Sequence, residues 1–234
     1  MSLKQELSLH PIDPNNAGRL VLAQELIEPL SKQIESVVPF EPESSSYPEY
    51  FREFVHNHLE RYRKHQVLLL PGGTTLAGDL ELDFNAEWIA AKRLAGLACD
   101  GDLTISGDLF NRNLSFGPLL FVRGNLTVHN MIKAGAPVIV LGNVHARGIV
   151  IGAYNDGVLR IAGDLKTQAY FLFDHDGYVR QQVEGPSYSS DEDDGRWREV
   201  LVDAAFENDR EDSPDVNRLW QLSRSGAKVL SGEI

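Results

Sequence analysis

The sequence has a single cysteine and no long apolar run, and both features restrict the class of protein. Cys99 has no second cysteine with which to form an internal disulfide, so we expect a reducing compartment, the cytoplasm. The longest unbroken apolar runs, such as Val67–Leu70 and Val138–Leu141, are far shorter than the roughly 20 residues that a membrane-spanning helix needs. The first residues also lack the basic start and apolar core of a secretion signal. We therefore expect no membrane partner.

Basic residues are few, and acidic residues are concentrated towards the C-terminus. The chain has 34 acidic and 22 basic side chains, a formal net charge of −12. Residues 181–215 hold twelve of the acidic residues and three of the basic ones, a formal charge of −9. Such a segment repels the phosphates of nucleic acids and attracts a basic partner within roughly 8 Å, the Debye length at physiological salt. We expect no nucleic-acid partner, and the segment either steers a basic protein or is a solubilising loop.

The motifs of nucleotide binding and nucleophilic catalysis are missing. The sequence has no Gly-x-x-x-x-Gly-Lys-Ser/Thr, no Gly-x-Gly-x-x-Gly that opens a helix, and no Gly-x-Ser-x-Gly. Cys99 lies beside Asp100, whose charge disfavours a thiolate. His58 and His65 are seven residues apart on one predicted helical face, but the pattern offers no third metal ligand. The sequence predicts no catalytic residue, no cofactor and no metal site.

Residues 1–66 are predicted to be mainly helical. Within residues 15–35 the apolar residues recur at three- and four-residue steps, the spacing of an amphipathic helix. Pro29 is expected to kink or split this helix. The polar, proline-bearing stretch 39–48 predicts a linker, and a second helix is expected over residues 48–63. We expect these helices to cap one end of the region that follows.

From Val67 to about residue 180 a short phrase recurs: a small or polar residue, glycine, aspartate or asparagine, and two aliphatic residues separated by one position. Glycine followed by aspartate or asparagine is typical of a corner, because glycine takes positive φ freely and these side chains bond nearby backbone. The aliphatic pair places two side chains on one face of a strand. Successive full copies begin 23, 23, 18 and 21 residues apart, and a half-copy stands at Ser106–Leu109. The full copies are Ala77–Leu82, Asp100–Ile105, Arg123–Val128, Leu141–Ala146 and Ala162–Thr167.

This period favours a parallel β-helix. A coil of roughly 20 residues contains three short strands and stacks on the next coil about 4.8 Å away. Leucine-rich repeats would need a Leu-x-x-Leu-x-Leu framework, and a β-propeller blade would need about twice the period. We predict a mainly β fold, a parallel β-helix (solenoid) over residues 67–180 interrupted by a short helix between residues 84 and 97. The helical region 1–66 precedes it, and residues 181–234 form the acidic segment and a C-terminal capping helix, which is expected either to close the stack or to brace it.

Two features keep an enzymatic alternative open. Glycines six residues apart, such as Gly142 and Gly148, are similar to the hexapeptide repeat of left-handed β-helix acyltransferases. In such an enzyme His129 or His145 would be the general base, and a trimer that binds coenzyme A is expected. Asp174-His175-Asp176 could orient a base or bind a metal, although the glycine that follows favours a turn.

Several stretches carry a likeness to a known group of proteins. They are Ser115–Leu126, Val140–Val144, Tyr154–Leu165, Phe173–Asp176 and the final Leu219–Gly226. In these stretches the chain resembles bacterial β-helix proteins of the polymer-forming cytoskeletal, bactofilin-like kind. Bactofilins polymerise end to end through exposed coil ends, so the resemblance implies a self-assembling scaffold and a homo-oligomer. The additional segments at both ends of this chain disfavour polymerisation, because capped ends cannot stack.

Proteins of this group are also similar to immunity proteins of bacterial polymorphic toxin systems. Those proteins are small, cytoplasmic and often acidic, and they occlude the active site of a toxin. This resemblance implies a non-catalytic immunity protein that binds a basic toxin domain, and we take it as the leading prediction. The expected partner-binding residues are aromatic anchors, a histidine and acidic steering residues. They are Tyr154, Asp156, His175, Tyr188, Asp191, Glu192, Asp193, Asp194 and Trp197.

Overall fold

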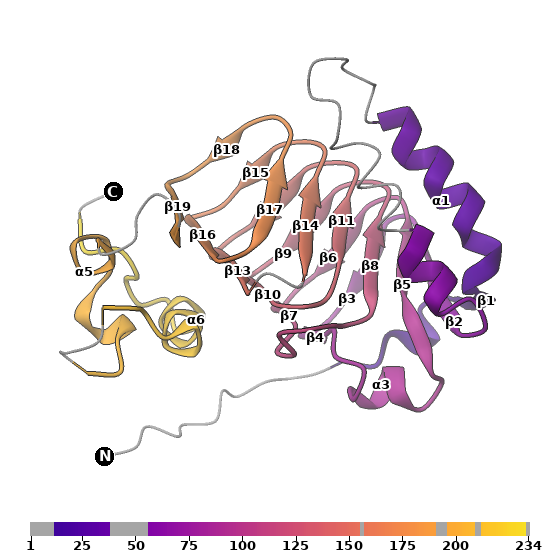
Figure 1. Ribbon diagram of the computed structural model, residues 1–234, viewed down its shortest axis with the longest axis horizontal. Coiled ribbons are helices and arrows are strands. Elements are labelled where there is room, and N and C mark those ends of the chain that lie inside the picture. The colour runs from indigo at the N-terminus through magenta and orange to yellow at the C-terminus, as the bar shows by residue number, and fades with distance from the viewer. Residues whose placement is uncertain (1–11, 38–55, 155–156, 191–195, 209–211, 233–234) are drawn as a thin grey trace.

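The computed structural model describes residues 12–37, 56–154, 157–190, 196–208 and 212–232. Within these residues the chain is mainly β, with 38% strand and 21% helix, and its parallel sheets stack into a β-solenoid (Figure 1). Each coil contributes one strand to each of three sheets, which we call the first, second and third sheet in the order in which a coil visits them. The predicted mainly β solenoid is therefore confirmed.

The three sheets account for every strand of the described chain. The first sheet contains β1 (Arg19–Leu22), β2 (Gln66–Pro71), β5 (Leu94–Asp100), β8 (Leu119–Val122), β11 (Val138–Val140), β14 (Val158–Ile161) and β17 (Asp176–Val179). The second contains β3 (Thr74–Leu76), β6 (Leu103–Ile105), β9 (Leu126–Val128), β12 (Val144–Ala146), β15 (Leu165–Lys166) and β18 (Val183–Glu184). The third contains β4 (Leu80–Glu81), β7 (Leu109–Phe110), β10 (Met131–Lys133), β13 (Ile149–Ala153), β16 (Ala169–Phe173) and β19 (Ser187–Ser189). The solenoid thus extends to Ser189, beyond the predicted end at residue 180.

The aliphatic pairs of the repeats form the core inside the coils. Leu126 and Val128 of β9 are buried inward, and Thr127 between them points outward, as the alternation of a strand requires. Equivalent pairs stack in register because β9 pairs in parallel with β6 and β12. Burial of these continuous apolar rows is the main force that holds the coils together.

The recurring phrase occupies two different corners of the coil. Most copies lie between the first and second sheets, where Oδ1 of Asp102 accepts from the backbone N of Asn125 at 2.7 Å and Asn125 does the same for Asn143 at 2.9 Å. The copy Ala77–Leu82 and the half-copy Ser106–Leu109 instead lie between the second and third sheets, because they lead into β4 and β7. The 23 residues from the start of Ala77–Leu82 to the start of Asp100–Ile105 therefore do not make up one coil, because the two copies lie at different corners.

The N-terminal region differs from its prediction. Residues 19–22 form β1, which pairs antiparallel with β2, and the helix α1 (Ala23–Val37) starts only after it; a short 3-10 helix, η1 (Pro14–Asn16), comes before β1. Helix α1 contains Pro29 without being split, and Pro29 is exposed, so water can reach the carbonyl that loses its partner.

The described N-terminal helices do not cap the stack as expected. Helix α1 packs Leu26 and Leu30 against the outer face of the first sheet (Figure 1). A helix over residues 56–61 packs Leu59 into the same cluster, while the rest of the second predicted helix lies largely outside the described residues. The N-terminal coil end is instead covered by the residues before α1, since the N of Ile12 donates to the carbonyl of Asp79.

The C-terminal helix also braces a side of the stack instead of closing its end. Helices α5 (Trp197–Val200) and α6 (Val216–Arg224), with the 3-10 turn η2 (Asp203–Ala205) between them, lie beside the third sheet (Figure 1). Their apolar side chains form one cluster with the outward residues of that sheet, such as Phe110, Ile149 and Phe171. The short helix predicted between residues 84 and 97 is confirmed as α3 (Glu87–Ala90).

Candidate functional site

Tyr154 and His175, two of the expected partner-binding residues, meet at the corner between the third and first sheets. Nδ1 of His175 donates to the carbonyl of Tyr154 in the preceding coil, and Nε2 accepts from Nζ of Lys133 at 3.0 Å. The Tyr154 side chain is 43% exposed beside this pair, and its backbone has a φ of 71°. The histidine of the Asp-His-Asp triplet therefore closes a corner, as the turn interpretation expects.

Lys133 is the buried partner that holds this corner. Its side chain starts from β10, is 1% exposed, and donates from Nζ to the carbonyl of Ala134 at 2.8 Å. Burial lowers the pKa of Lys133 well below its usual value and, together with the Lys133 charge, lowers the pKa of His175 to about 3. His175 is therefore neutral at pH 7. Gly152 makes room for the ring, because a Cβ there would lie 2.4 Å from Cδ2 of His175.

A buried ion pair secures the last two coils next to this corner. The guanidinium of Arg160 on β14 pairs with the carboxylate of Asp176 on β17, and its Nη1 also donates to the Asp176 carbonyl at 2.9 Å. The hydroxyl of Tyr170 is buried without a hydrogen-bond partner, and burial raises the pKa of Tyr170 well above its usual value. The Arg160–Asp176 pair thus fixes β17 on its neighbour β14, with the guanidinium buried and the carboxylate partly exposed.

The other expected contact residues are buried, half-buried or outside the described residues. Trp197 is 3% exposed and packs on Phe173 with ring centroids 4.8 Å apart, so it anchors α5 on the third sheet and offers no surface to a partner. Tyr188 is half-buried and stacks on Phe171. The expected contacts Asp156, Asp191, Glu192, Asp193 and Asp194 lie outside the described residues.

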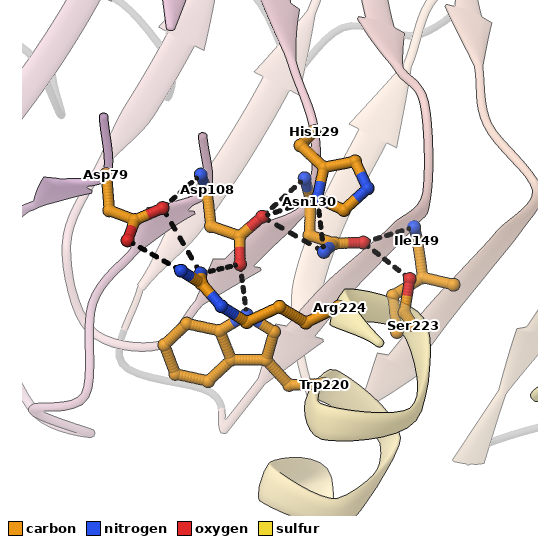
Figure 2. Close-up of polar contacts among 8 residues, drawn as sticks. All are labelled: Asp79, Asp108, His129, Asn130, Ile149, Trp220, Ser223 and Arg224. Carbon is orange, nitrogen blue, oxygen red and sulfur yellow. Dashed lines mark hydrogen bonds and ion pairs between the residues drawn. The ribbon is translucent and has the colours of Figure 1, made fainter. Parts of the chain in front are cut away.

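A second polar network lies under α6, at the corner between the second and third sheets (Figure 2). Oδ1 of Asp79 accepts from the backbone N of Asp108 at 2.8 Å, and Oδ1 of Asp108 accepts from the backbone N of Asn130 at 3.1 Å. Asn130 then accepts from the backbone N of Ile149 at 2.9 Å. This ladder repeats the arrangement of the first corner, but its side chains are buried.

Three residues of α6 use the ladder as their docking site (Figure 2). Nε1 of Trp220 donates to Oδ2 of Asp108 at 2.7 Å, and Oγ of Ser223 donates to Oδ1 of Asn130 at 2.6 Å. The guanidinium of Arg224 bridges the carboxylates of Asp79 and Asp108, which raise the pKa of Arg224. The ladder therefore carries the negative charge that neutralises a cation from α6.

His129 lies at the edge of this network and is one of the two candidate general bases. Its Nδ1 lies 3.1 Å from Oδ1 of the buried Asp108, so the outer nitrogen, Nε2, is left for other partners. No hydroxyl or thiol of the described residues forms a hydrogen bond with His129. His145 lies on the outer face of the second sheet, away from this network. The two histidines thus lie at different places on the solenoid surface, and no three potential ligands gather for a metal within the described chain.

The outer face of the second sheet is uncovered by the described chain. Helix α1 covers the first sheet and the C-terminal helices cover the third, but no described helix lies over the second (Figure 1). Each strand turns one side chain outward, and the parallel register aligns these side chains in a single row that we call the outer row. Its members are Thr75, Thr104, Thr127, His145, Lys166 and Glu184.

Fold and surfaces together define a β-solenoid that displays one flat sheet face. Comparisons of the sequence with family models, with curated proteins and with solved structures found no match. The described helices include none that is long and apolar enough to cross a bilayer.

Sequence reasoning missed the residues that lock the corners. Lys133 and Arg160 lie in otherwise apolar strands, and the sequence patterns above did not predict a role for them. A charged residue within such a strand does indicate a buried polar contact. No local sequence pattern indicates that α6 docks through Trp220 and Arg224, because their partner Asp108 lies more than a hundred residues away in the sequence.

Proposed function

We propose that this chain is a non-catalytic protein-binding β-helix whose recognition surface is the outer row of the second sheet. The observation that carries this proposal is that the chain's own helices cover two of the three faces, whereas none of the described residues forms a helix over the third. In its finer form, the protein is an immunity protein that occludes the active site of a basic toxin domain.

Rigidity of the outer row favours recognition of a folded partner. Its four central strands, β6, β9, β12 and β15, pair on both sides, and their inner side chains are buried. Lys166 and Glu184 form an ion pair of 3.0 Å along it, and His145 and Thr127 stand beside each other in register. A preorganised face loses little conformational entropy on association, which favours affinity.

The ionisable groups near the expected site support a non-catalytic role. His175 uses both ring nitrogens in hydrogen bonds, and Lys133 is buried behind it. A general base needs an accessible lone pair within hydrogen-bonding reach of its substrate. Neither group meets that requirement, so the corner serves stability.

The charge distribution supports a basic partner. The formal net charge is −12, and residues 181–215 contribute −9 of it. Charge of one sign accelerates encounter with a partner of the opposite sign. A toxin domain that binds or cleaves nucleic acid has a basic surface and fits this field.

A toxicity rescue tests the proposal. The protein is co-expressed with the product of the adjacent gene in cells that this product kills, and survival and complex formation are measured. The double variant Thr104→Arg, Thr127→Arg places two bulky cations on the outer row; we expect it to fold and to lose rescue and binding. Gln24→Arg on the exposed side of α1 is the matched control and keeps both. Rescue by the double variant, or no rescue by the unchanged chain, contradicts the proposal.

A second candidate function is self-association through the open coil end. The strands β17, β18 and β19 are the last of their sheets within the described chain, and the inward Val179 and Val183 of that coil are only half-buried. Unpaired strand edges next to apolar surface template pairing with another chain. Because β1 occupies the opposite edge of the first sheet, this geometry favours a dimer through like ends over an open filament.

Light scattering after gel filtration, over a range of concentrations, tests this second function. The expected result is a dimer that Val183→Lys converts to a monomer, because a lysine at the half-buried end reaches water in the monomer and is trapped in the dimer. A monomer at the highest concentration that stays in solution contradicts self-association.

A further inference from the structure

A hollow at the N-terminal coils has no role in the proposed function. It lies between the end of the helix at 56–61 and the α3 turn, with a volume of about 310 Å³. The rings of Tyr62 and Phe84 stand 5.3 Å apart in its wall, and Phe84 is followed at 6.1 Å by the ring of Phe116, which is 50% exposed. The hollow is lined by Tyr62, His65, Phe84, Ile89, Ala90, Arg93 and Leu94.

His65, one of the residues that line this hollow, has an unsatisfied polar atom. Its Nδ1 is buried and has no hydrogen-bond partner. The ring is held at its edge by Tyr62, with centroids 5.5 Å apart. A buried polar atom without a partner costs free energy, so a bound group that hydrogen-bonds to Nδ1 would be favoured.

Arg93 brings a cation to the same hollow in a strained backbone conformation. Its φ is 52°, the left-handed region where glycine is the usual residue after a helix, and it follows directly on the α3 turn. The exposed guanidinium has no ion pair among the residues that the structure describes. Strain retained at a non-glycine residue points to a use for that side chain.

We propose that this hollow binds a small aromatic carboxylate. The ring of the ligand packs against Tyr62 and Phe84 over the apolar floor of Ile89 and Leu94. Its carboxylate pairs with Arg93, and its polar edge hydrogen-bonds to Nδ1 of His65. Each part of the ligand thus satisfies one feature that the chain leaves open: the apolar wall, the cation and the unpaired nitrogen.

Calorimetric titration of the full chain tests this site with benzoate and indole-3-carboxylate as probes. We expect saturable binding of indole-3-carboxylate at a single site and several-fold weaker binding of benzoate, which has no polar ring edge. Binding of indole, which lacks the carboxylate, and of acetate, which lacks the ring, should be at least about tenfold weaker. N-acetyltryptophan is tested as well, because it represents the alternative ligand, a C-terminal aromatic residue of a protein chain. Binding of that compound alone, or of no probe, overturns the proposal of a free small aromatic acid.

Two variants assign the roles of the polar side chains. Arg93→Gly relieves the strain, so we expect an unchanged or higher melting temperature together with at least about a tenfold loss of probe affinity. His65→Phe keeps the ring and removes Nδ1, and we expect several-fold weaker binding. Lys228→Gln, an exposed cation on another surface, is the control and leaves affinity unchanged. Probe affinity that is the same in Arg93→Gly as in the unchanged chain overturns the site.

Discussion

At the scale of single residues, buried polar side chains hold the coils together at a corner by hydrogen bonds, which apolar side chains cannot form. Lys133 and His175 come from coils that are not neighbours and meet because Gly152 leaves the space between them empty. Burial penalises both charged forms, so this contact is stable only while His175 is neutral.

The folded-state pKa of His175 therefore predicts a dependence of stability on pH. The pKa is lowered from 6.5 to about 3, so the stabilisation is complete above 6.5 and is lost as the pH falls towards 3. His58, whose pKa is lowered to about 4 by burial, acts in the same direction from the N-terminal helix. We expect chemical denaturation of His175→Gln to show a flatter loss of stability between these limits than the unchanged chain. An equal slope in both proteins contradicts the assignment.

The inward aliphatic residues predict a large loss of stability on truncation. Leu126 and Leu165 are fully buried in register within the second sheet. Replacement of either by alanine removes burial and leaves a cavity, so we expect unfolding free energy to fall by about 2–5 kcal/mol. Denaturation in urea measures this value, and a change below about 0.5 kcal/mol, typical of a surface site, would show that the residue is not in the core.

At the scale of elements, α6 is held by charge as well as by apolar packing. Arg224 stands between two carboxylates that are almost completely buried, and Trp220 donates to one of them. Removal of Arg224 leaves these carboxylates without their cation, so we expect Arg224→Met to destabilise the protein by about 3 kcal/mol.

A triple variant separates charge pairing from packing at α6. Asp79→Asn and Asp108→Asn keep an acceptor oxygen for the ladder and remove the buried charges. Added to Arg224→Met, they should restore part of the lost stability, measured by thermal and urea unfolding. The restoration is incomplete because the amide at position 108 keeps one acceptor oxygen for the ladder and turns its NH2 towards Nε1 of Trp220. A triple variant that is no more stable than Arg224→Met alone would mean that the charges do not account for the docking.

The elements differ in how far the sequence could specify them. The repeat predicted the solenoid because its glycine and acidic corners and aliphatic pairs act locally, within one coil. The docking faces of α1 and α6 were not predictable, since an amphipathic stripe shows that a helix packs but does not show on which face. Among the expected contact residues, the structure brings Tyr154 and His175 together at one corner. Trp197 is buried because it packs against Phe171 and Phe173 of the third sheet.

At the scale of the whole molecule, the acidic segment predicts an electrostatic effect on association. The variant that neutralises its central run is Asp191→Asn, Glu192→Gln, Asp193→Asn and Asp194→Asn. We expect its melting temperature to be nearly unchanged and its association rate with the product of the adjacent gene to be several-fold lower, most clearly at low salt. If neither the rate nor its salt dependence changes, the segment only keeps the protein in solution.

At this scale the three sheets of the solenoid differ in whether the chain's own helices pack on their outer faces. Helices pack on the first and third sheets, residues before α1 cover the N-terminal end of the solenoid, and within the described residues the outer row of the second sheet is uncovered. Chemical footprinting of histidines in the complex with the adjacent gene's product tests this division most directly. We expect diethyl pyrocarbonate modification of His145 on the outer row to be suppressed in the complex, while the exposed His56 reacts as before. Unchanged modification of His145 in a stable complex would contradict it.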